Sequence, residues 1–462
     1  MMRESGTQAT VGRSYRVLAW FLRVVVNTFF RRIEVVGLQN VPTGGPVIFA
    51  GNHPNALMDG FVVATMCGRT PVHFMGNAKL WRYPLLGMFL DALGTVKVTP
   101  REERVETASN DATFATLFDV LESGNCMGIF PEGISHTGSQ LVRLKTGTAR
   151  IALAVGARRA VKVTLVPCGL TYMHRHRFRS QALIQFGAPL VIDDSWLDAY
   201  TTSETETVRR LTEHVAGALA DVTLNAPDWD TLRFIHTARR LYKPASARLT
   251  LGTYVELSRR FVERYVATAD RPEIRQLRTE VEDYQAQLDL LGLKDHHLRD
   301  ALGVLDAWKG VLWRGAAVIA LLPLAIPGML FHLPVGWVAM TAGERLSYGR
   351  DDVATLKVIT AIVLLPLIYL GVGALVGVSV GPWWGGGVTV VLPLTFLASI
   401  KIVEVQANMT LATVTSLRLS RFAREVAELR KVRGRLVERV RDVADRHADP
   451  NLPRVFSRPD FD

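Results

Sequence analysis

A histidine and an aspartate lie close together in the segment AGNHPNALMDG, residues 50–60. Pro54 favours an extended conformation for His53 and a helix start directly after it, so we expect His53 at a turn between a strand and a helix. An imidazole at such a turn can act as a general base if a carboxylate, here Asp59, fixes its tautomer and stabilises the imidazolium that forms. A capping histidine beside a surface aspartate would show the same spacing, so the pair by itself does not establish a site.

Two later segments place charged side chains directly after predicted strands. Arg101 lies in GTVKVTPREE, residues 94–103, where a guanidinium can bind a phosphate through two hydrogen bonds. Glu132 lies in GIFPEGISHTGS, residues 128–139, a loop that can direct its carboxylate and backbone N–H groups to one edge of a sheet. Ligand sites of open α/β sheets gather at the carboxyl ends of the strands, so we expect these groups near His53.

Two more segments complete an ordered set. LKTGTARIA, residues 144–152, adds Lys145 and a glycine that permits close approach of the backbone. LVPCGL, residues 165–170, ends a buried strand. Each segment is a weak signal alone, whereas the five together, in this order, predict one shared site.

Short β-rich runs alternate with helical patterns between residues 33 and 190. Parallel strands need long crossover connections, so this alternation predicts an α/β domain, which we place at residues 33–202, with a mostly parallel sheet flanked by helices. The predicted strands are 33–37, 46–51, 71–76, 94–98, 126–130, 161–170 and 182–187, and the predicted helices between them are 56–67, 79–93, 111–123 and 144–156.

The parts outside this domain are predicted to be helical. Residues 203–310 are charged and rich in leucine, and because they suggest no chemistry of their own, a scaffold is the simpler interpretation. The tail, residues 402–462, repeats apolar positions at helical spacing as far as residue 447, which predicts an amphipathic helix that is solvated or self-associating.

Two long uncharged runs, residues 315–340 and 358–400, indicate a membrane region at 311–401. A helix needs about 20 apolar residues to cross a bilayer, so the second run is long enough for two spans with a turn at PWWGGG, residues 382–387. Prolines interrupt the first run, which is therefore either one span or a re-entrant hairpin. Uncharged stretches of this length are rare in soluble folds.

Basic side chains flank both runs: Arg345, Arg350 and Lys357 lie between them, and Lys401, Arg418, Arg421 and Arg424 follow the second. Basic loops remain on the cytoplasmic side. Two consecutive hairpins would therefore keep both basic segments and the α/β domain in the cytoplasm. We predict this arrangement in the inner (cytoplasmic) membrane of the cell.

The N-terminal segment, residues 1–32, contains a stretch at 13–32 that combines large apolar side chains with arginines. It predicts either a helix lying in the membrane interface or an amphipathic helix capping a soluble core. Arginines interrupt the apolar stretch and no small-residue cleavage site follows, so we expect no signal peptide.

The composition limits the classes of partner. Of the 462 residues 48% are hydrophobic, and 54 Lys+Arg against 43 Asp+Glu give a formal net charge of +11, which fits an anionic membrane, phosphorylated substrates or nucleic acid. The arginines lack the aromatic interleaving of nucleic-acid binders, so we expect no such partner. The cysteines, Cys67, Cys126 and Cys168, form no CxxC pair, which argues against a disulfide framework and a zinc site and for a reducing compartment. His174 and His176 could bind a metal, but a strand-end loop on a basic surface explains them more simply, and we predict no metal.

NHPNALMD, GTVKVTPR, FPEGIS and VPCGL resemble, in order, the four sequence blocks of the PlsC-like glycerolipid acyltransferases, over roughly residues 33–190. The longer segments FPEGISHTGSQLVRLKTG and RSQALIQFGAPL, the helical region and the membrane runs look more like the branch that acylates glycerol 3-phosphate or dihydroxyacetone phosphate at the first hydroxyl. The family usually has four residues between its histidine and its aspartate, whereas five separate His53 from Asp59. We expect the extra residue to be absorbed in the turn at Pro54 and Asn55.

The resemblance implies direct acyl transfer from acyl-CoA or acyl-carrier protein, with no acyl-enzyme and no cofactor. It implies that His53 is the base, that Asp59 orients it, and that nearby backbone N–H groups stabilise the oxyanion. Other residues of the blocks are then expected at the substrates: Arg101 and, as the weaker candidate, Lys145 at the phosphate, Glu132 and Gly133 shaping the acceptor site, and Asn52 and Ser135 as further contacts.

Two other functions remain open at this stage. A lysophosphatidate or other lysophospholipid acyltransferase shares the same motifs and needs a wider, more apolar acceptor groove. A basic membrane scaffold in which the histidine motif is incidental is the alternative from another class. For the enzyme, the expected partners are membrane lipids, an acyl thioester donor and a small phosphorylated glycerol acceptor.

Overall fold

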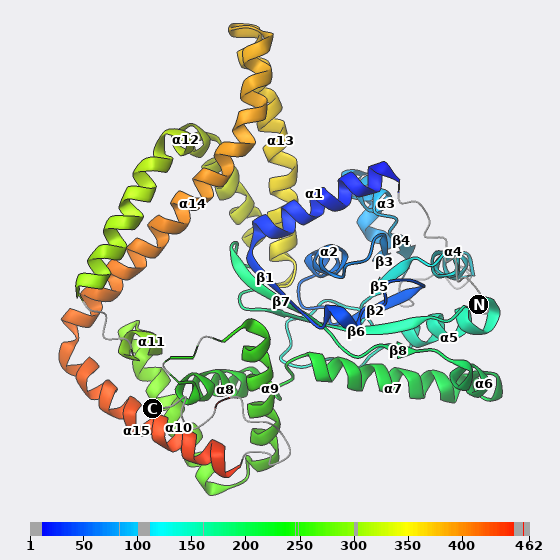
Figure 1. The fold of residues 1–462 in the computed structure, drawn as a ribbon, viewed down its shortest axis with the longest axis horizontal. Helices are drawn as coiled ribbons and strands as arrows, with labels where there is room; N and C mark the ends of the chain where they lie inside the picture. Colours follow the sequence, from blue (N-terminus) through cyan, green and yellow to red (C-terminus); the bar gives the residue numbers. More distant parts are fainter. Residues whose placement is uncertain are drawn as a thin grey trace, which may run out of the picture. The chain divides into compact units, whose positions relative to one another are not determined.

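The computed structural model describes residues 12–82, 84–99, 111–159, 161–244, 246–247, 249–299, 304–447 and 456. They divide into two compact units (Figure 1). The first unit comprises the described residues up to Trp229 together with Leu249–Arg259 and Tyr348–Thr355. The second comprises the remaining described residues and is helical.

A mixed, mostly parallel sheet forms the centre of the first unit. Its strand order is β1-β7-β6-β2-β5-β3-β4, with β8 beside β6. Strand β2 pairs in parallel with β5 and β6, and β3 pairs in parallel with β5 and β4, whereas β6 is antiparallel to β7 and β8. The strands are β1 Phe30–Val36, β2 Val47–Gly51, β3 Val72–Asn77, β4 Val96–Val98, β5 Cys126–Ile129, β6 Thr164–Tyr172, β7 Ser180–Phe186 and β8 Leu190–Val191. The predicted fold class is confirmed.

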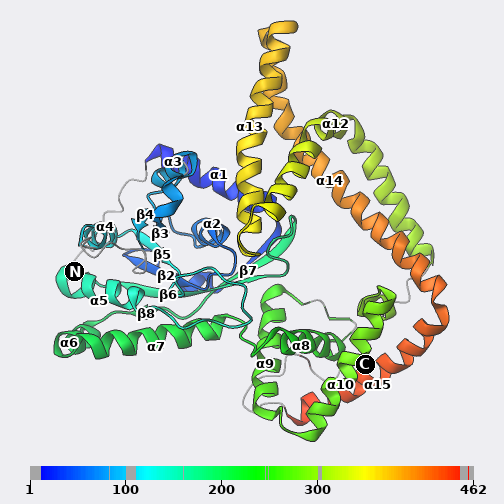
Figure 2. The same ribbon diagram turned by 180° about the vertical axis from the view of Figure 1, so that it is seen from behind.

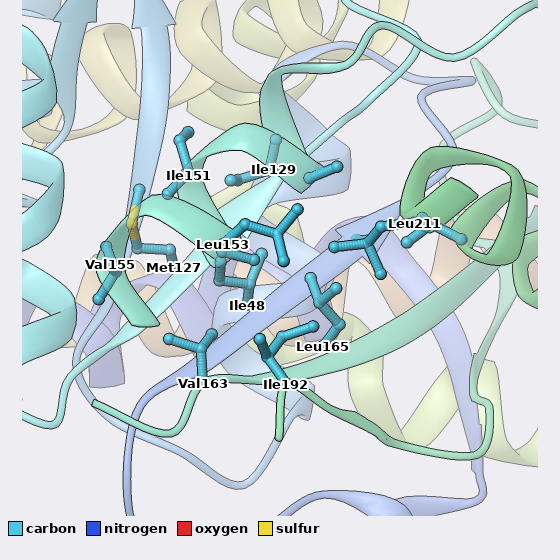
Figure 3. Close-up of a cluster of buried hydrophobic side chains, with 14 of the residues drawn as sticks. Ile48, Met127, Ile129, Ile151, Leu153, Val155, Val163, Leu165, Ile192 and Leu211 are labelled. Carbon is cyan, nitrogen blue, oxygen red and sulfur yellow. The ribbon is translucent and has the colours of Figure 1, made fainter. Parts of the chain in front are cut away.

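Alternating apolar residues build a core on one face of this sheet. Ile48 of β2 is paired with Met127 of β5 and with Leu165 of β6 in the parallel register. Residues paired in this way point to the same face of a sheet, so the three side chains point toward the same layer of helices (Figure 3). Ile151 and Leu211 cover them from α5 and α7. The helices of this unit are α1 Arg13–Phe29, α2 Leu57–Met66, α3 Pro84–Ala92, α4 Asp111–Glu122, α5 Gly147–Arg159, α6 Asp194–Thr202 and α7 Glu204–Val222, with short 3-10 helices η1 Leu38–Asn40 and η2 Ala78–Arg82.

Helix α7 belongs to the sheet-containing unit. Its buried side chains Val208, Leu211, Val215 and Leu219 lie in the same core as the strands. The first unit therefore extends to Trp229, past the boundary that the change of composition at residue 202 predicted.

The second unit contains a layer of soluble-type helices. These are α8 Trp229–Tyr242, α9 Leu251–Thr268, α10 Pro272–Leu291, α11 Asp295–Arg299 and α15 Ala423–Arg446. The first residue of α8 and the part of α9 up to Arg259 belong to the first unit. The tail helix α15 packs along α10 and α11 through apolar side chains and ion pairs, among them Arg439 to Glu280 (2.6 Å) and Arg433 to Asp295 (2.8 Å). The sequence predicted a solvated or self-associating helix, whereas the structure gives it an intramolecular partner.

Among the described residues, three helices are long and apolar enough to cross a membrane. They are the part Val318–Arg345 of α12 (Val304–Arg345), α13 (Val353–Ser379) and α14 (Pro382–Arg421). Apart from the first three residues of α13, they belong to the second unit. The turn between the last two falls at Val380 and Gly381, so PWWGGG begins α14 instead of forming the turn. Large apolar side chains on these helices are exposed, as expected of surfaces that meet lipid. The protein is an integral membrane protein by this criterion.

Helix α12 runs without a break from Val304 to Arg345 but bends along its length (Figures 1 and 2). It contains Pro323, Pro327 and Pro334, and an internal proline both removes a backbone hydrogen bond and clashes with the preceding turn, which kinks a helix. The first uncharged run is therefore neither a straight span nor two separate helices. Its topology in the bilayer stays a prediction.

Candidate active site

His53 lies two residues after the end of β2, at the carboxyl edge of the sheet. Its Nδ1 is 2.9 Å from Oδ2 of Asp59, near the start of α2. The aspartate side chain is fully buried, while that of the histidine is 20% exposed. The structure thus brings the two residues together as the sequence predicted, with a buried carboxylate bound to one nitrogen of an accessible imidazole.

The backbone between His53 and Asp59 contains a strained turn. Ala56 has φ 43° and ψ −129°, a conformation that L-residues rarely adopt, and its N–H donates to Oγ of Ser135 (3.1 Å). The N–H of Asn55 donates to Asp59 Oδ2 (2.7 Å). The five intervening residues thus retain the contact of Asp59 with His53, and the position of the extra residue stays a prediction.

Glu132 ties the loop after β5 to His53. Its Oε1 accepts the backbone N–H of His53 (2.8 Å), and its Oε2 accepts the N–H of Val142 (3.1 Å) and contacts Nε2 of His136. The N–H of Gly138 donates to His136 Nδ1 (3.0 Å), which leaves Nε2 as the protonated nitrogen that donates to Glu132. The carboxylate of Glu132 is 1% exposed and bound on both oxygens, so it shapes the site by holding the main chain of His53 in place.

The other predicted contacts lie around the same edge. Asn52 pairs with the backbone of Leu170 in β6, donating to its carbonyl (3.0 Å) and accepting its N–H (2.7 Å). Gly133 has φ 72°, and a Cβ there would come within 2.7 Å of the aliphatic carbons of Lys145, so only glycine lets the lysine lie across this turn. Asn52 and Ser135 are thus loop anchors, whereas Lys145 passes beside the loop that holds His53. Arg101 lies outside the described residues.

An aromatic ring forms one wall of the site. The ring of Phe130 stacks on the imidazole of His53, with centroids 4.1 Å apart and planes at 3°. Phe74 lies behind Phe130 at 6.1 Å, and a Cβ on Gly128 would come within 2.0 Å of the Phe74 ring. The strand glycine therefore makes room for an apolar layer that shields one face of the imidazole from water.

Two residues, one at the end of β6 and one in the hairpin that follows it, reach the site, and the sequence analysis missed them. The hydroxyl of Tyr172 donates to Oδ1 of Asp59 (2.6 Å), and Nη1 of Arg175 donates to the carbonyls of Pro54 (3.0 Å) and His136 (3.3 Å). Burial and the nearby Asp59 raise the pKa of Tyr172, and burial lowers the pKa of Arg175. YMHRHRF directly follows the VPCGL strand, which is the signal that could have placed them at this edge.

Two histidines of the same hairpin lie on the protein surface. His174 and His176 are exposed. In the described part of the chain, no group of three or more His, Cys, Asp or Glu side chains could hold a metal ion.

The arrangement has the parts that a general-base site requires: an imidazole at the carboxyl edge of an α/β sheet, a buried carboxylate bound to one of its nitrogens, and a Pro-Glu-Gly loop that fixes its main chain. A profile of the acyltransferase family matches residues 32–171, and a profile of the glycerol-3-phosphate acyltransferase 2 C-terminal domain matches residues 234–452. The chain belongs to the PlsC-like acyltransferase family, which confirms the resemblance read from its four sequence blocks.

The chain is also similar to several individual proteins. Glycerol-3-phosphate O-acyltransferase 2 of Saccharomyces cerevisiae is 38% identical over 281 residues, covering 57% of this chain and 38% of the yeast protein. An uncharacterized acyltransferase of Schizosaccharomyces pombe is 32% identical over 454 residues, covering 77% of this chain and 67% of that protein. The crystal structure of the 1-acyl-sn-glycerophosphate acyltransferase PlsC of Thermotoga maritima is 18% identical with a TM-score of 0.33, covering 44% of this chain and 77% of that one. The chain thus spans well under half the length of the S. cerevisiae relative.

Proposed function

We propose that this protein transfers a fatty acyl group from an acyl thioester, acyl-CoA or acyl-carrier protein, to the sn-1 hydroxyl of glycerol 3-phosphate or dihydroxyacetone phosphate. The main support for this choice of acceptor is the match of residues 234–452 to the glycerol-3-phosphate acyltransferase 2 C-terminal domain. That region lies outside residues 32–171, which match the general acyltransferase family. The S. cerevisiae relative, named glycerol-3-phosphate O-acyltransferase 2, supports the same acceptor.

The geometry of His53 supports a direct transfer. With Nδ1 bound to Asp59, the free nitrogen Nε2 takes the proton of the acceptor hydroxyl as the oxygen attacks the thioester carbonyl. The tetrahedral intermediate then expels the thiolate, which takes the proton back from the imidazolium. One C–O bond forms, one C–S bond breaks, and the histidine returns to its starting state. The chain needs no group of its own to carry the acyl chain.

The charged residues of the site serve the acceptor. Lys145 and Arg101 are the proposed contacts of the phosphate, since Lys145 lies across Gly133 beside the loop that holds His53. Gly133 and the loop fixed by Glu132 shape the acceptor site. Backbone N–H groups of the same loops are the proposed donors to the oxyanion.

The reaction takes place at a membrane surface in this proposal. Leu22, Val26 and Phe29 of α1 are buried. On the same helix, Val17 and Trp20 are each 65% exposed. The exposed side of α1 therefore carries large apolar side chains together with Arg16 and Arg23, a combination that suits the bilayer interface, where the acyl chains of donor and product reside. We place the catalytic unit on the cytoplasmic face of the membrane, with product release directly into the lipid.

The deciding experiment assays the purified protein in detergent with one labelled acyl-CoA and three acceptors side by side: glycerol 3-phosphate, dihydroxyacetone phosphate and lysophosphatidate. We expect acylation of one or both of the small phosphorylated acceptors at the first hydroxyl and little of lysophosphatidate. Preferred acylation of lysophosphatidate would replace the proposed acceptor. Absence of transfer to any of the three, by protein that is folded by circular dichroism, would remove the enzymatic proposal.

A further inference from the structure

Every oxygen of the Asp59 carboxylate is bound. Oδ2 accepts the N–H of Asn55 (2.7 Å) and lies 2.9 Å from His53 Nδ1, and Oδ1 accepts the hydroxyl of Tyr172 at 2.6 Å. The aspartate side chain has no solvent exposure. A buried carboxylate oxygen without a donor would be strongly destabilised, so the tyrosine supplies the one hydrogen bond that Oδ1 receives from the described residues.

We propose that Tyr172 is a positioning residue of the acyl transfer, whose hydroxyl holds Asp59 ionised and fixed in the orientation that presents His53 to the acceptor. The inference rests on the proposed function and adds a third member to the His53–Asp59 pair. It extends the reacting centre into a strand of the sheet, because Tyr172 is the last residue of β6.

The surroundings of Tyr172 suit a hydroxyl that always donates. Burial and the charge of Asp59 raise the pKa of the Tyr172 phenol, so the hydroxyl keeps its proton over the pH range in which the enzyme is assayed. Its ring stacks on Phe30 of β1, with centroids 5.4 Å apart and planes at 25°. The ring is therefore fixed by packing, and the hydroxyl reaches Asp59 without depending on a mobile side chain.

Other charged or titratable groups also face the pair. Glu132 and His136 come from the loop after β5, Arg175 from the β6–β7 hairpin, and Asp352 from the connection between α12 and α13. Burial and the neighbouring Asp351 raise the pKa of Asp352, and His53 lowers it. All of these groups are retained when only the Tyr172 hydroxyl is removed, so a change in pH dependence reports on that hydroxyl.

The test is Tyr172→Phe, measured as kcat, both KM values and the pH dependence of kcat/KM. A hydrogen bond to a charged group that is lost in a buried site changes a rate roughly tenfold or more, so we expect kcat to fall about tenfold with both KM values within about twofold. Without the donor, the negative charge of Asp59 acts more strongly on the imidazole and the carboxylate itself takes a proton more readily. Both effects move the acid limb of kcat/KM to higher pH.

Two comparisons separate positioning from a loss of structure. Tyr15→Phe removes a hydroxyl that accepts the N–H of Val72 (3.1 Å) at the amino end of β3, the edge of the sheet opposite His53, and it should leave kcat and the pH profile as in the wild type. In the Asp59→Asn background, Tyr172→Phe should cause little further loss, because the hydroxyl acts through Asp59. Equal, additive losses in both backgrounds would overturn the proposal, as would a wild-type pH profile in Tyr172→Phe.

A second variant covers the case in which Tyr172→Phe does not fold. Replacement of Tyr172 by 3-fluorotyrosine keeps the hydroxyl and makes it a stronger donor, so the acid limb should move to lower pH, and an unchanged limb would overturn the proposal. The comparisons are made with whichever acceptor the wild type uses. Failure of the proposed acceptor therefore shows in the wild type, whereas failure of the Tyr172 role shows only in the difference between variants.

Discussion

At His53, one imidazole nitrogen contacts Asp59 and one ring face stacks on Phe130, so Nε2 is the nitrogen to which the described residues offer no hydrogen bond. His53→Ala should lower kcat by about 10²–10⁴-fold, the usual contribution of a general base, with little change in melting temperature because the side chain is partly exposed. Acyl transfer and thermal unfolding measured on the same preparation check this. His214→Ala, on α7 beside Trp196, is the control and should keep its activity. Substantial residual turnover in His53→Ala would refute the base assignment.

The backbone of Ala56 predicts an unusual response to substitution. At φ 43° and ψ −129° a glycine is unstrained, whereas a β-branched residue is strongly disfavoured. We expect Ala56→Gly to unfold at nearly the wild-type temperature and Ala56→Val to lose roughly 1–3 kcal/mol of stability together with activity, because the same turn sets the distance from His53 to Asp59. Denaturant unfolding of the two variants tests this, and equal stabilities would show that the turn is not strained.

At the scale of elements, the hydrophobic pattern predicted most of what positions the site. Seven strands lie where alternating β-rich runs were found, and β2, β5 and β6 bring His53, Glu132 and Tyr172 to one edge because parallel register aligns their carboxyl ends. The two-residue strand β8 is too short to carry a periodic signal. The contact of Tyr172 with Asp59 joins residues 113 positions apart, a pairing that depends on sheet order and cannot be read from local spacing.

The membrane elements were harder to predict for a different reason. Length and composition identify apolar helices. The bend in α12 and the start of α14 at Pro382 depend in addition on how surrounding residues satisfy the backbone groups that each proline leaves without a hydrogen bond. The packing of the tail helix could not be predicted either, because a helix with charges between its apolar positions can face solvent, a second chain or its own chain. In this structure α15 packs against α10 and α11.

The junction of α11 and α15 contains an ion pair that should dominate local stability. Arg433 donates through Nε (2.8 Å) and Nη2 (3.3 Å) to Asp295, which also accepts from Tyr284 (2.8 Å). Both ionic side chains are largely buried, so Arg433→Met leaves a buried carboxylate without its cation and should cost about 3–5 kcal/mol. Limited proteolysis should show early release of the tail helix.

The neighbouring Lys431 provides the control for that experiment. Its ion pair with Glu428 spans 2.8 Å with both side chains 71% exposed, and exposed pairs contribute little. Lys431→Met should therefore be cleaved at the wild-type rate. If Arg433→Met is cleaved no faster than Lys431→Met, the buried pair does not hold the tail.

For the whole molecule, the proposed topology can be tested with single cysteines, because the native Cys67, Cys126 and Cys168 are all buried. Tyr348, between α12 and α13, is 99% exposed, and Val380, between α13 and α14, is 66% exposed. In intact cells an impermeant maleimide should label Val380→Cys and reach Tyr348→Cys only after permeabilisation, since basic loops stay in the cytoplasm. Labelling of position 348 from outside would reject the proposed orientation.

Helix α14 continues without interruption for 40 residues, about 60 Å at 1.5 Å per residue, which is roughly twice the hydrocarbon thickness of a bilayer. In the proposed membrane arrangement about half of its length would extend beyond the hydrocarbon core. Helices respond to bilayer thickness by tilting, and a change in tilt of about 10° would move the free end of a 30 Å segment by roughly 5 Å. The tail helix α15, which follows α14 after Phe422, would move with that end, so we expect its position to depend on bilayer thickness.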